Sequence, residues 1–84
     1  MSEGLTTTTQ TAILDLRGVP CPMNCTRVIL ALEALANGDV LTTILDDGDP
    51  VVNVTTTIAR EGEIILSRTR LVDGAWQVEI ERHV

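Results

Sequence analysis

The sequence predicts an α/β fold, a two-layer sandwich in the order β-α-β-α-β-β, with two helices on one face of a mixed four-stranded sheet. Three observations predict it. Polar and apolar residues alternate along the segments expected to be strands, two segments between them have helical periodicity, and a turn signature joins the last two strands. The length of 84 residues suits one domain.

The first strand is expected over residues 12–17, with its leucines on one face and Asp15 and Arg17 on the other. The first helix should begin at residue 22 or 23 and continue to residue 36. Proline is tolerated at a helix start, and the pair Asn37-Gly38 favours a helix end.

The second strand is expected over residues 40–45. Asp49 suits the N-cap of the second helix, and Pro50 suits its first helical position. This helix should extend over residues 51–61, weakened by three consecutive threonines, and Gly62 should follow it as the C′ residue.

The last two strands, over residues 63–71 and 75–83, should form an antiparallel hairpin around Asp73-Gly74. The final strand has an apolar face of Trp76, Val78 and Ile80 and a polar face of Gln77, Glu79 and Glu81. One face of the sheet is therefore expected to be buried and the other solvated, which places both helices on the same side. The first β-α-β unit should be a right-handed crossover with parallel strands.

The beginning of the sequence has neither a basic start nor an apolar stretch, so it does not resemble a signal peptide. Residues 1–11 are polar and threonine-rich, and we expect a disordered tail there and a folded domain over residues 12–84. No apolar segment reaches the roughly 18 residues of a membrane span. Two cysteines are too few for a disulfide scaffold, so we expect a reduced, cytoplasmic protein.

The composition excludes several classes of function. Six arginines and no lysine stand against twelve acidic residues, a formal charge of −6, and Trp76 is the only aromatic residue. A free-standing nucleic-acid binder needs a broad basic face or stacking aromatic side chains. Schiff-base chemistry needs a lysine. The negative charge favours partners whose docking surface is basic.

Cys21 is the candidate for chemistry because it stands immediately before the first helix. Unpaired amides and the helix dipole favour a thiolate there. Lowering the pKa of an ordinary thiol from about 8.5 to 7 takes about 2 kcal/mol, and a helix N-terminus supplies roughly 0.3–1 kcal/mol, or up to about 2 when partly buried. Arg17 or Arg27 would add to this effect. The alternative, a small apolar residue in a tight turn, is equally compatible with the position.

Cys25 falls on the apolar stripe of the same helix, with Val28, Ile29, Leu32, Leu35 and Ala36. We therefore expect it to pack in the core with a raised pKa. The sharper alternative is a thiol that resolves Cys21. Residues four apart on a helix have Cβ atoms about 5–6 Å apart, whereas a disulfide needs about 3.8 Å. Such a bridge would require the helix start to unwind.

The remaining polar groups have structural interpretations. Asp46, Asp47 and Asp49 lack the rest of a calcium-binding loop, so we expect a solvated turn and a helix cap. No metal site is expected, because His83 lies far along the chain from both cysteines. A second pair of polar residues, Arg68 and Arg70, should form a solvated stripe beside Glu79 or Glu81, or else a small contact patch for a partner.

The stretch Asp15-Leu16-Arg17-Gly18-Val19-Pro20-Cys21-Pro22 resembles the signature of the TusA (SirA-like) family of sulfur carriers. The resemblance continues over about residues 12–82 and includes Asp46-Asp47 after the second strand. It implies the same β-α-β-α-β-β sandwich that the periodicity predicts.

The resemblance also implies a function. Cys21 would accept sulfur as a persulfide from a donor such as a cysteine desulfurase or a rhodanese-like protein, and would relay it to an acceptor protein in tRNA thiolation, molybdenum-cofactor maturation or sulfur oxidation. Around it, Gly18 and Pro22 would shape the turn, and Asn24, Arg17 and Arg27 would tune the thiolate. This is a carrier rather than a stand-alone enzyme, expected to act as a monomer without cofactor, metal, nucleic acid or membrane.

The sequence departs from the family pattern at Asn24, which replaces the second proline of Cys-Pro-x-Pro and indicates a variant branch. Its side chain could bond an amide of the helix start or the Cys21 sulfur. Elsewhere, Glu63 replaces the histidine that often follows the second helix, and Cys25 stands where the family usually has an aliphatic residue. Two other functions remain open: a non-catalytic interaction module that uses the sheet face or hairpin, and a redox sensor that uses both cysteines.

Overall fold

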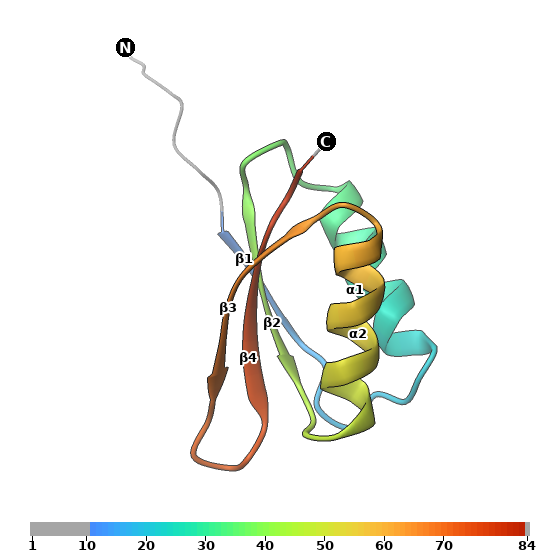
Figure 1. Cartoon of the computed structure of the whole chain (residues 1–84), viewed down its shortest axis with the longest axis vertical. Helices are drawn as coiled ribbons and strands as arrows, with labels where there is room; N and C mark the ends of the chain where they lie inside the picture. The colour runs from blue at the N-terminus through green and yellow to red at the C-terminus, as the bar shows by residue number, and fades with distance from the viewer. Residues whose placement is uncertain (1–10, 84) are drawn as a thin grey trace.

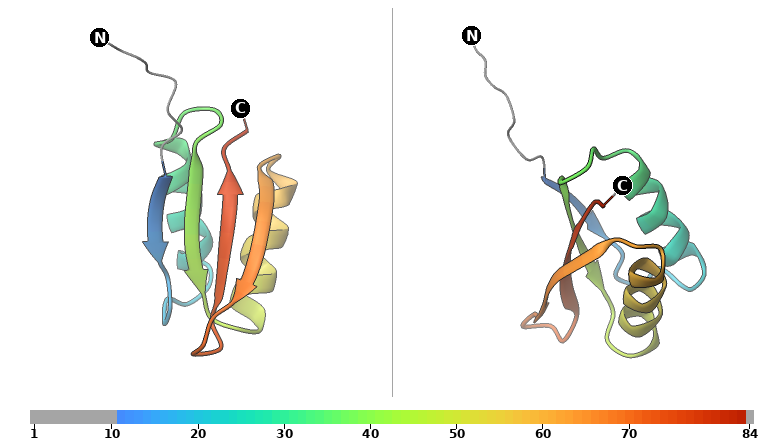
Figure 2. Two further views of the ribbon diagram at one scale, coloured as in Figure 1. Left: turned by 90° about the vertical axis from the view of Figure 1, so that its left-hand side faces the viewer. Right: turned by 45° about the horizontal axis from the view of Figure 1, so that its top comes forward.

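The computed structural model describes residues 11–83, which form a four-stranded sheet with two helices packed on one of its faces (Figures 1 and 2). The elements are β1 Thr11–Asp15, α1 Met23–Glu33, β2 Val40–Leu45, α2 Asp49–Arg60, β3 Ile64–Arg70 and β4 Trp76–Glu81. The predicted order and the two-layer architecture are therefore confirmed. Of the tail predicted over residues 1–11, only Thr11 is among the described residues, and it is the first residue of β1.

The sheet has the strand order β1-β2-β4-β3. β1 and β2 are parallel, as a strand-helix-strand unit requires, whereas β4 runs antiparallel to both β2 and β3. β2 and β4 are therefore central, and β1 and β3 are the edges. Both helices begin at the end of the sheet that also carries the β3–β4 hairpin (Figure 1).

The core lies between the helices and the sheet and is almost entirely aliphatic. Its buried members are Leu16, Val28, Leu32, Leu41, Leu45, Val51, Val54, Ile58, Val78 and Ile80. Burying an aliphatic side chain of this size stabilises a fold by about 1.5–3 kcal/mol, so this cluster supplies the main driving force. No helix within residues 11–83 is long and apolar enough to cross a membrane.

The first helix ends at Glu33, three residues before the predicted end at Ala36. The N–H groups of Ala34 and Leu35 bond to carbonyls three residues earlier, at 3.2 and 2.9 Å, so the last turn tightens and the helix stops. The N–H of Ala36 then donates to the Asp39 carboxylate at 3.0 Å. This side-chain acceptor ends the helix before the expected stop signal is reached.

The second helix begins with Gly48 as its N-cap, and the prediction of Asp49 at that position is wrong. The Gly48 carbonyl accepts the first helical bond, from the N–H of Val52 at 3.2 Å, which places Asp49 inside the first turn together with Pro50. A carboxylate there still complements the helix dipole. The prediction of Gly62 as the C′ residue is confirmed by its φ of 94°.

The hairpin turns around Asp73 and Gly74, as predicted. Residues 72–74 form the tip of the loop, which is closed by a bond from the N–H of Leu71 to the Ala75 carbonyl at 2.8 Å. Gly74 has a φ of 90°, which a left-handed position in such a loop requires. The Asp73 carboxylate accepts the N–H of Ala75 at 3.0 Å and so fixes the turn.

The predicted pairing of Arg68 and Arg70 with Glu79 or Glu81 is wrong, because β3 contains a bulge between Ile65 and Ser67. The register sets Ile65 opposite Ile80, Arg68 opposite Val78 and Arg70 opposite Trp76. Residues opposite one another in an antiparallel pair share a face of the sheet. One inserted residue therefore moves both arginines to the face that carries the helices.

Candidate functional site

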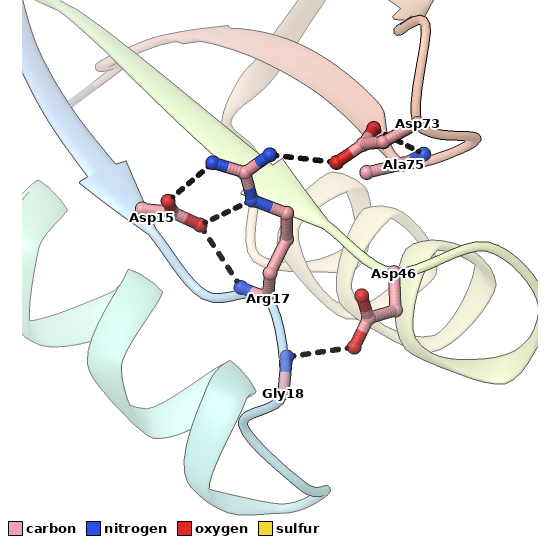
Figure 3. A network of polar contacts seen from close by, with 6 residues as sticks. All are labelled: Asp15, Arg17, Gly18, Asp46, Asp73 and Ala75. Carbon is pink, nitrogen blue, oxygen red and sulfur yellow. Dashed lines mark hydrogen bonds and ion pairs between the residues drawn. The ribbon is translucent and has the colours of Figure 1, made fainter.

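Cys21 is exposed and stands in the loop between β1 and α1, two residues before the helix begins. Three loops meet at this end of the molecule: the β1–α1 loop, the β2–α2 loop and the β3–β4 hairpin. Figure 3 shows the polar contacts that join them. The cysteine is thus presented by a loop that is held from more than one side.

Gly18 is the point at which the β2–α2 loop holds the cysteine loop. Its N–H donates to the Asp46 carboxylate at 2.8 Å (Figure 3). Its φ is 79°, a left-handed value, and a Cβ added there would meet nothing within 4 Å. The glycine is therefore required by backbone conformation and not by crowding.

Arg17 is engaged by two carboxylates, so its predicted role in tuning the Cys21 thiolate finds no support in these contacts. The guanidinium forms a forked pair with Asp15, at 3.1 and 2.7 Å, and reaches Asp73 of the hairpin at 2.7 Å (Figure 3). Hydrogen bonds with Arg17 lower the pKa of Asp15, and the bond from the Ala75 N–H, followed by that from Arg17, lowers the pKa of Asp73. Arg17 ties the cysteine loop to the hairpin.

The pair Asp46-Asp47 bridges these loops and was expected only to form a solvated turn. While Asp46 holds Gly18, the carboxylate of Asp47 accepts the indole N–H of Trp76 at 2.8 Å and an N–H of Arg70 at 3.3 Å. The indole bond is the largest influence that lowers the pKa of Asp47. Arg70 lies 5.5 Å from the centre of the Trp76 ring, within range of a cation–π contact.

The turn that leads into α1 has Pro22 as its N-cap, and the Cys21-Pro22 peptide bond is cis. The carbonyl of Pro20 accepts the N–H of Asn24 at 3.0 Å, and the carbonyl of Pro22 accepts that of Thr26 at 3.1 Å. No acidic residue occupies the first turn of α1. No carboxylate in the first turn of α1 therefore offsets the positive end of the helix dipole.

Asn24 is fully buried. Of the two bonds expected for its side chain, the structure shows the one to the helix start: Oδ1 accepts the N–H of Cys25 at 2.7 Å. The other side-chain atom, Nδ2, is buried and has no hydrogen-bond partner within residues 11–83. The side chain of Asn24 thus accepts the N–H of Cys25, which would otherwise need a main-chain carbonyl as its acceptor.

Cys25 is partly buried and packs against the core cluster, as predicted. Burial raises the pKa of its thiol, the predicted direction. The Cys21 thiol adds to this rise, whereas the Thr57 hydroxyl of α2 opposes it. Cys21 and Cys25 stand on either side of the start of α1, the first exposed and the second partly buried.

Arg27 is exposed and forms no ion pair with any residue from 11 to 83. Its neighbour at the helix start, Met23, is 50% exposed.

An open hollow of about 210 Å³ lies beside the start of α2 and is lined by Asp47, Gly48, Val51, Val52, Arg68 and Trp76. No three His, Cys, Asp or Glu side chains in the described part of the chain are grouped to hold a metal ion.

These features define a small α/β domain that presents one exposed thiol where a helix begins. Comparison with known proteins identifies its family. The TusA family, described as "Sulfurtransferase TusA", matches residues 12–82, and the chain belongs to this family. The family resemblance drawn from the sequence is thereby confirmed. Membership of a family of sulfur carriers implies donor and acceptor proteins as partners.

Two relatives agree with this assignment. A protein of Archaeoglobus fulgidus described as "Putative sulfur carrier protein" is 30% identical over 70 residues, which are 83% of this chain and 80% of that relative. The crystal structure of a SirA-like protein from Desulfitobacterium hafniense superposes with a TM-score of 0.76 at 23% identity, over 87% of this chain and 99% of that chain. The structural similarity to the SirA-like protein shows that the two chains share a fold.

Proposed function

We propose that this chain accepts sulfur as a persulfide on Cys21 and relays it to a partner protein. One observation carries the proposal: Cys21 is exposed two residues before α1, whose first turn contains no acidic residue. A helix N-terminus favours an anion, and the thiolate is the nucleophilic form of cysteine. An exposed position also lets another protein bring its own sulfur to the site.

The transfer consists of two exchanges of the thiol–disulfide type. The Cys21 thiolate attacks the outer sulfur of a persulfide on the donor. The sulfur–sulfur bond of the donor breaks, its cysteine leaves as a thiolate, and Cys21 holds the persulfide. A thiolate of the acceptor then attacks that same outer sulfur, and Cys21 is released as a thiolate. No metal or organic cofactor takes part.

The residues around Cys21 have separate parts in this proposal. Gly18 and Pro22 shape the loop, through a left-handed conformation and the helix N-cap respectively. Arg27 contributes a cation that no carboxylate of the described residues neutralises. Arg17 is left out because both its partners are carboxylates.

As part of this proposal, we assign the chain to a variant branch of the family with Cys-Pro-x-Asn, on the basis of Asn24. Two hydrogen bonds support this distinction: the main-chain N–H of Asn24 donates to the Pro20 carbonyl, and its side chain accepts the N–H of Cys25. A proline at this position has neither an N–H nor an acceptor on its side chain. The branch therefore builds its helix start with bonds that a second proline does not make.

The donor in this proposal is a cysteine desulfurase or a rhodanese-like protein. Either would dock around Cys21, where exposed Met23 offers an apolar contact and Arg27 a cation. The net charge of −6 favours a basic docking surface on the partner.

Mass spectrometry after incubation with a cysteine desulfurase and cysteine tests the proposal. At early times the chain should gain the mass of one sulfur atom, and fragmentation should place it on Cys21. The Cys25→Ala variant should gain the same mass, and Cys21→Ala should not. An adduct that forms equally well in Cys21→Ala would overturn the assignment.

A further inference from the structure

We propose that the open edge of β3 and the hollow beside α2 together form a docking site for an extended, acidic segment of a partner protein. The segment pairs with β3 as an additional strand, places one apolar side chain in the hollow and sets one carboxylate against Arg68. This site is separate from the sulfur transfer proposed above, because Cys21 is not among the residues that line the hollow.

The first argument is that β3 is an edge strand with one unpaired side. Within residues 11–83 its main chain pairs with β4 alone, so the N–H and C=O groups on its other side have no main-chain partner. Beyond the bulge, the register with β4 is regular from Ser67 to Arg70. This part of β3 can therefore pair with an added strand, which is how many sheet edges bind extended peptides.

The second argument is that the hollow opens between this edge strand and α2, which lies behind β3 in Figure 2. Its volume is about 210 Å³, and its walls include Arg68 of β3, Trp76 of β4 and Val52 of α2. Val52 is 55% exposed, so an apolar wall faces solvent. Pockets for small molecules usually measure about 300–1,000 Å³. A smaller, open hollow suits one apolar side chain of a docked segment better than a free small molecule.

The third argument is the charge of the lining. The bulge sets Arg68 on the face of the sheet that carries the helices, and its side chain forms no ion pair with any residue from 11 to 83. The carboxylate in the lining, that of Asp47, already accepts N–H groups from Trp76 and Arg70. A guanidinium can form two parallel bonds with one carboxylate, so an acidic side chain of the partner fits Arg68.

The geometry of a strand sets the spacing of these two anchors. Side chains two positions apart on a strand point to the same face. The apolar residue in the hollow and the acidic residue beside Arg68 should therefore be separated by one residue in the sequence of the partner segment.

A second copy of this chain does not fit the same edge. Two β3 strands paired antiparallel about Thr69 would set Arg68 of one copy opposite Arg70 of the other. Like charges directly opposite one another destabilise a strand pair. The net charge of −6 does not exclude an acidic partner, because salt screens exposed charges beyond about 8–10 Å. The occupant is therefore a different protein.

The test selects a phage-displayed library of random short peptides on the full chain. Enriched peptides should share an acidic residue two positions from a large apolar residue. Arg68→Glu should bind a selected synthetic peptide at least about tenfold more weakly in fluorescence anisotropy, as the reversal of one close charge pair predicts. Arg60→Glu makes the same change of charge at an exposed position outside the hollow and should bind like the wild type.

Two further variants test the hollow itself. Val52→Glu places a carboxylate in its wall and should also weaken binding, whereas Asn53→Glu, at the next exposed position of α2, should not. Circular dichroism checks that each variant is folded. Hydrogen exchange of the full chain with bound peptide should show new protection of amides in β3.

Three outcomes would overturn the inference. One is a selection that enriches no peptide over the bare support, and another is equal binding by the wild type and Arg68→Glu. The third is new protection confined to amides outside β3. Cys21→Ala should bind the peptide like the wild type. Failure of sulfur loading on Cys21 therefore leaves this site intact, and failure of peptide binding leaves the carrier function intact.

Discussion

At the scale of single residues, Cys25 is subject to two opposing influences. Burial and the Cys21 thiol raise the pKa of Cys25, whereas the Thr57 hydroxyl opposes the rise. Its thiolate fraction therefore increases with pH, but only above the range of an ordinary thiol. The sequence predicted the raised pKa from the apolar stripe. It did not predict Thr57, which is 32 positions away on another helix.

The rate at which iodoacetamide alkylates Cys25 should consequently rise with pH through the raised pKa of Cys25. Thr57→Val removes the hydroxyl that favours the thiolate, so we expect slower alkylation of Cys25 than in the wild type at a given pH and a profile shifted to higher pH. The measurement is the alkylated fraction of the Cys25 peptide, followed by mass spectrometry in a series of buffers.

Thr56→Val is the matched control, because Thr56 is exposed on the same helix. Its pH profile should coincide with that of the wild type. Identical profiles for Thr57→Val and Thr56→Val would contradict the assigned role of the Thr57 hydroxyl.

At the scale of elements, the site depends on loops that are far apart in sequence. The bond between Gly18 and Asp46 spans 28 positions, and the pair Arg17–Asp73 spans 56. Both join the loop that carries Cys21 to neighbouring loops. The end of the sheet therefore acts as a frame for the cysteine, and each of its members contributes to the loop's position.

Replacement of Asp46 should weaken this frame in a graded way. Asp46→Ala leaves the Gly18 N–H without its acceptor, and we expect a loss of about 1 kcal/mol in unfolding free energy and slower loading of Cys21 by a desulfurase. Asp46→Asn keeps an acceptor oxygen and should lie close to the wild type in both respects. Urea denaturation and the loading rate are the measurements, and an Asp46→Ala variant that matches Asp46→Asn in both would refute this role.

The sequence predicted most of the fold because local patterns determine it: alternation for the strands, helical periodicity for the helices, and Asp73-Gly74 for the hairpin. It missed features that depend on contacts between distant segments or on one residue of register. The early end of α1 needs the Asp39 carboxylate, and the bulge after Ile65 leaves the composition of β3 unchanged while it reverses the face of Arg68 and Arg70.

The candidate site was predictable in part. Cys21 followed from its place before a helix and from the family signature, and Asn24 from its departure from that signature. The bonds of Arg17 and Asp46 were not predictable, because nothing in a single sequence says which of several carboxylates a given arginine or amide will meet. The tandem Asp46-Asp47 was the available signal, and its interpretation as a solvated turn overlooked the two loops that it joins.

At the scale of the whole molecule, the two ends of the sheet carry different kinds of ion pair. At the hairpin end, Arg17 and Arg70 are held by exposed carboxylates. At the opposite end, Arg82 and Glu63 form a more buried pair at 2.7 Å, with the Glu63 side chain only 6% exposed. The protein therefore has a solvent-screened network near Cys21 and a shielded ion pair far from it.

Acid should loosen the hairpin end. Native contacts lower the pKa values of Asp15, Asp47 and Asp73, so the unfolded chain binds protons first as the pH falls. Their contribution is fully present above the ordinary aspartate pKa of about 4 and is lost as the pH falls through the lowered values. Urea midpoints from circular dichroism should therefore decline below about pH 4.

Asp73→Asn is the control for this prediction. It loses the ionic contact with Arg17 while an amide oxygen can still accept the N–H of Ala75. Its urea midpoint should fall less steeply with acid than that of the wild type, and an equally steep fall would argue against this network as a cause.

Trp76 has a further consequence, because it is the only aromatic residue in the chain. Its indole N–H is bonded to Asp47 in the turn next to Asp46, and its ring lies under Arg70. Because the chain contains no tyrosine or phenylalanine, all of its aromatic fluorescence must come from this one indole. The tryptophan emission of the unlabelled protein should therefore change when a partner protein binds at the end of the sheet that carries Cys21.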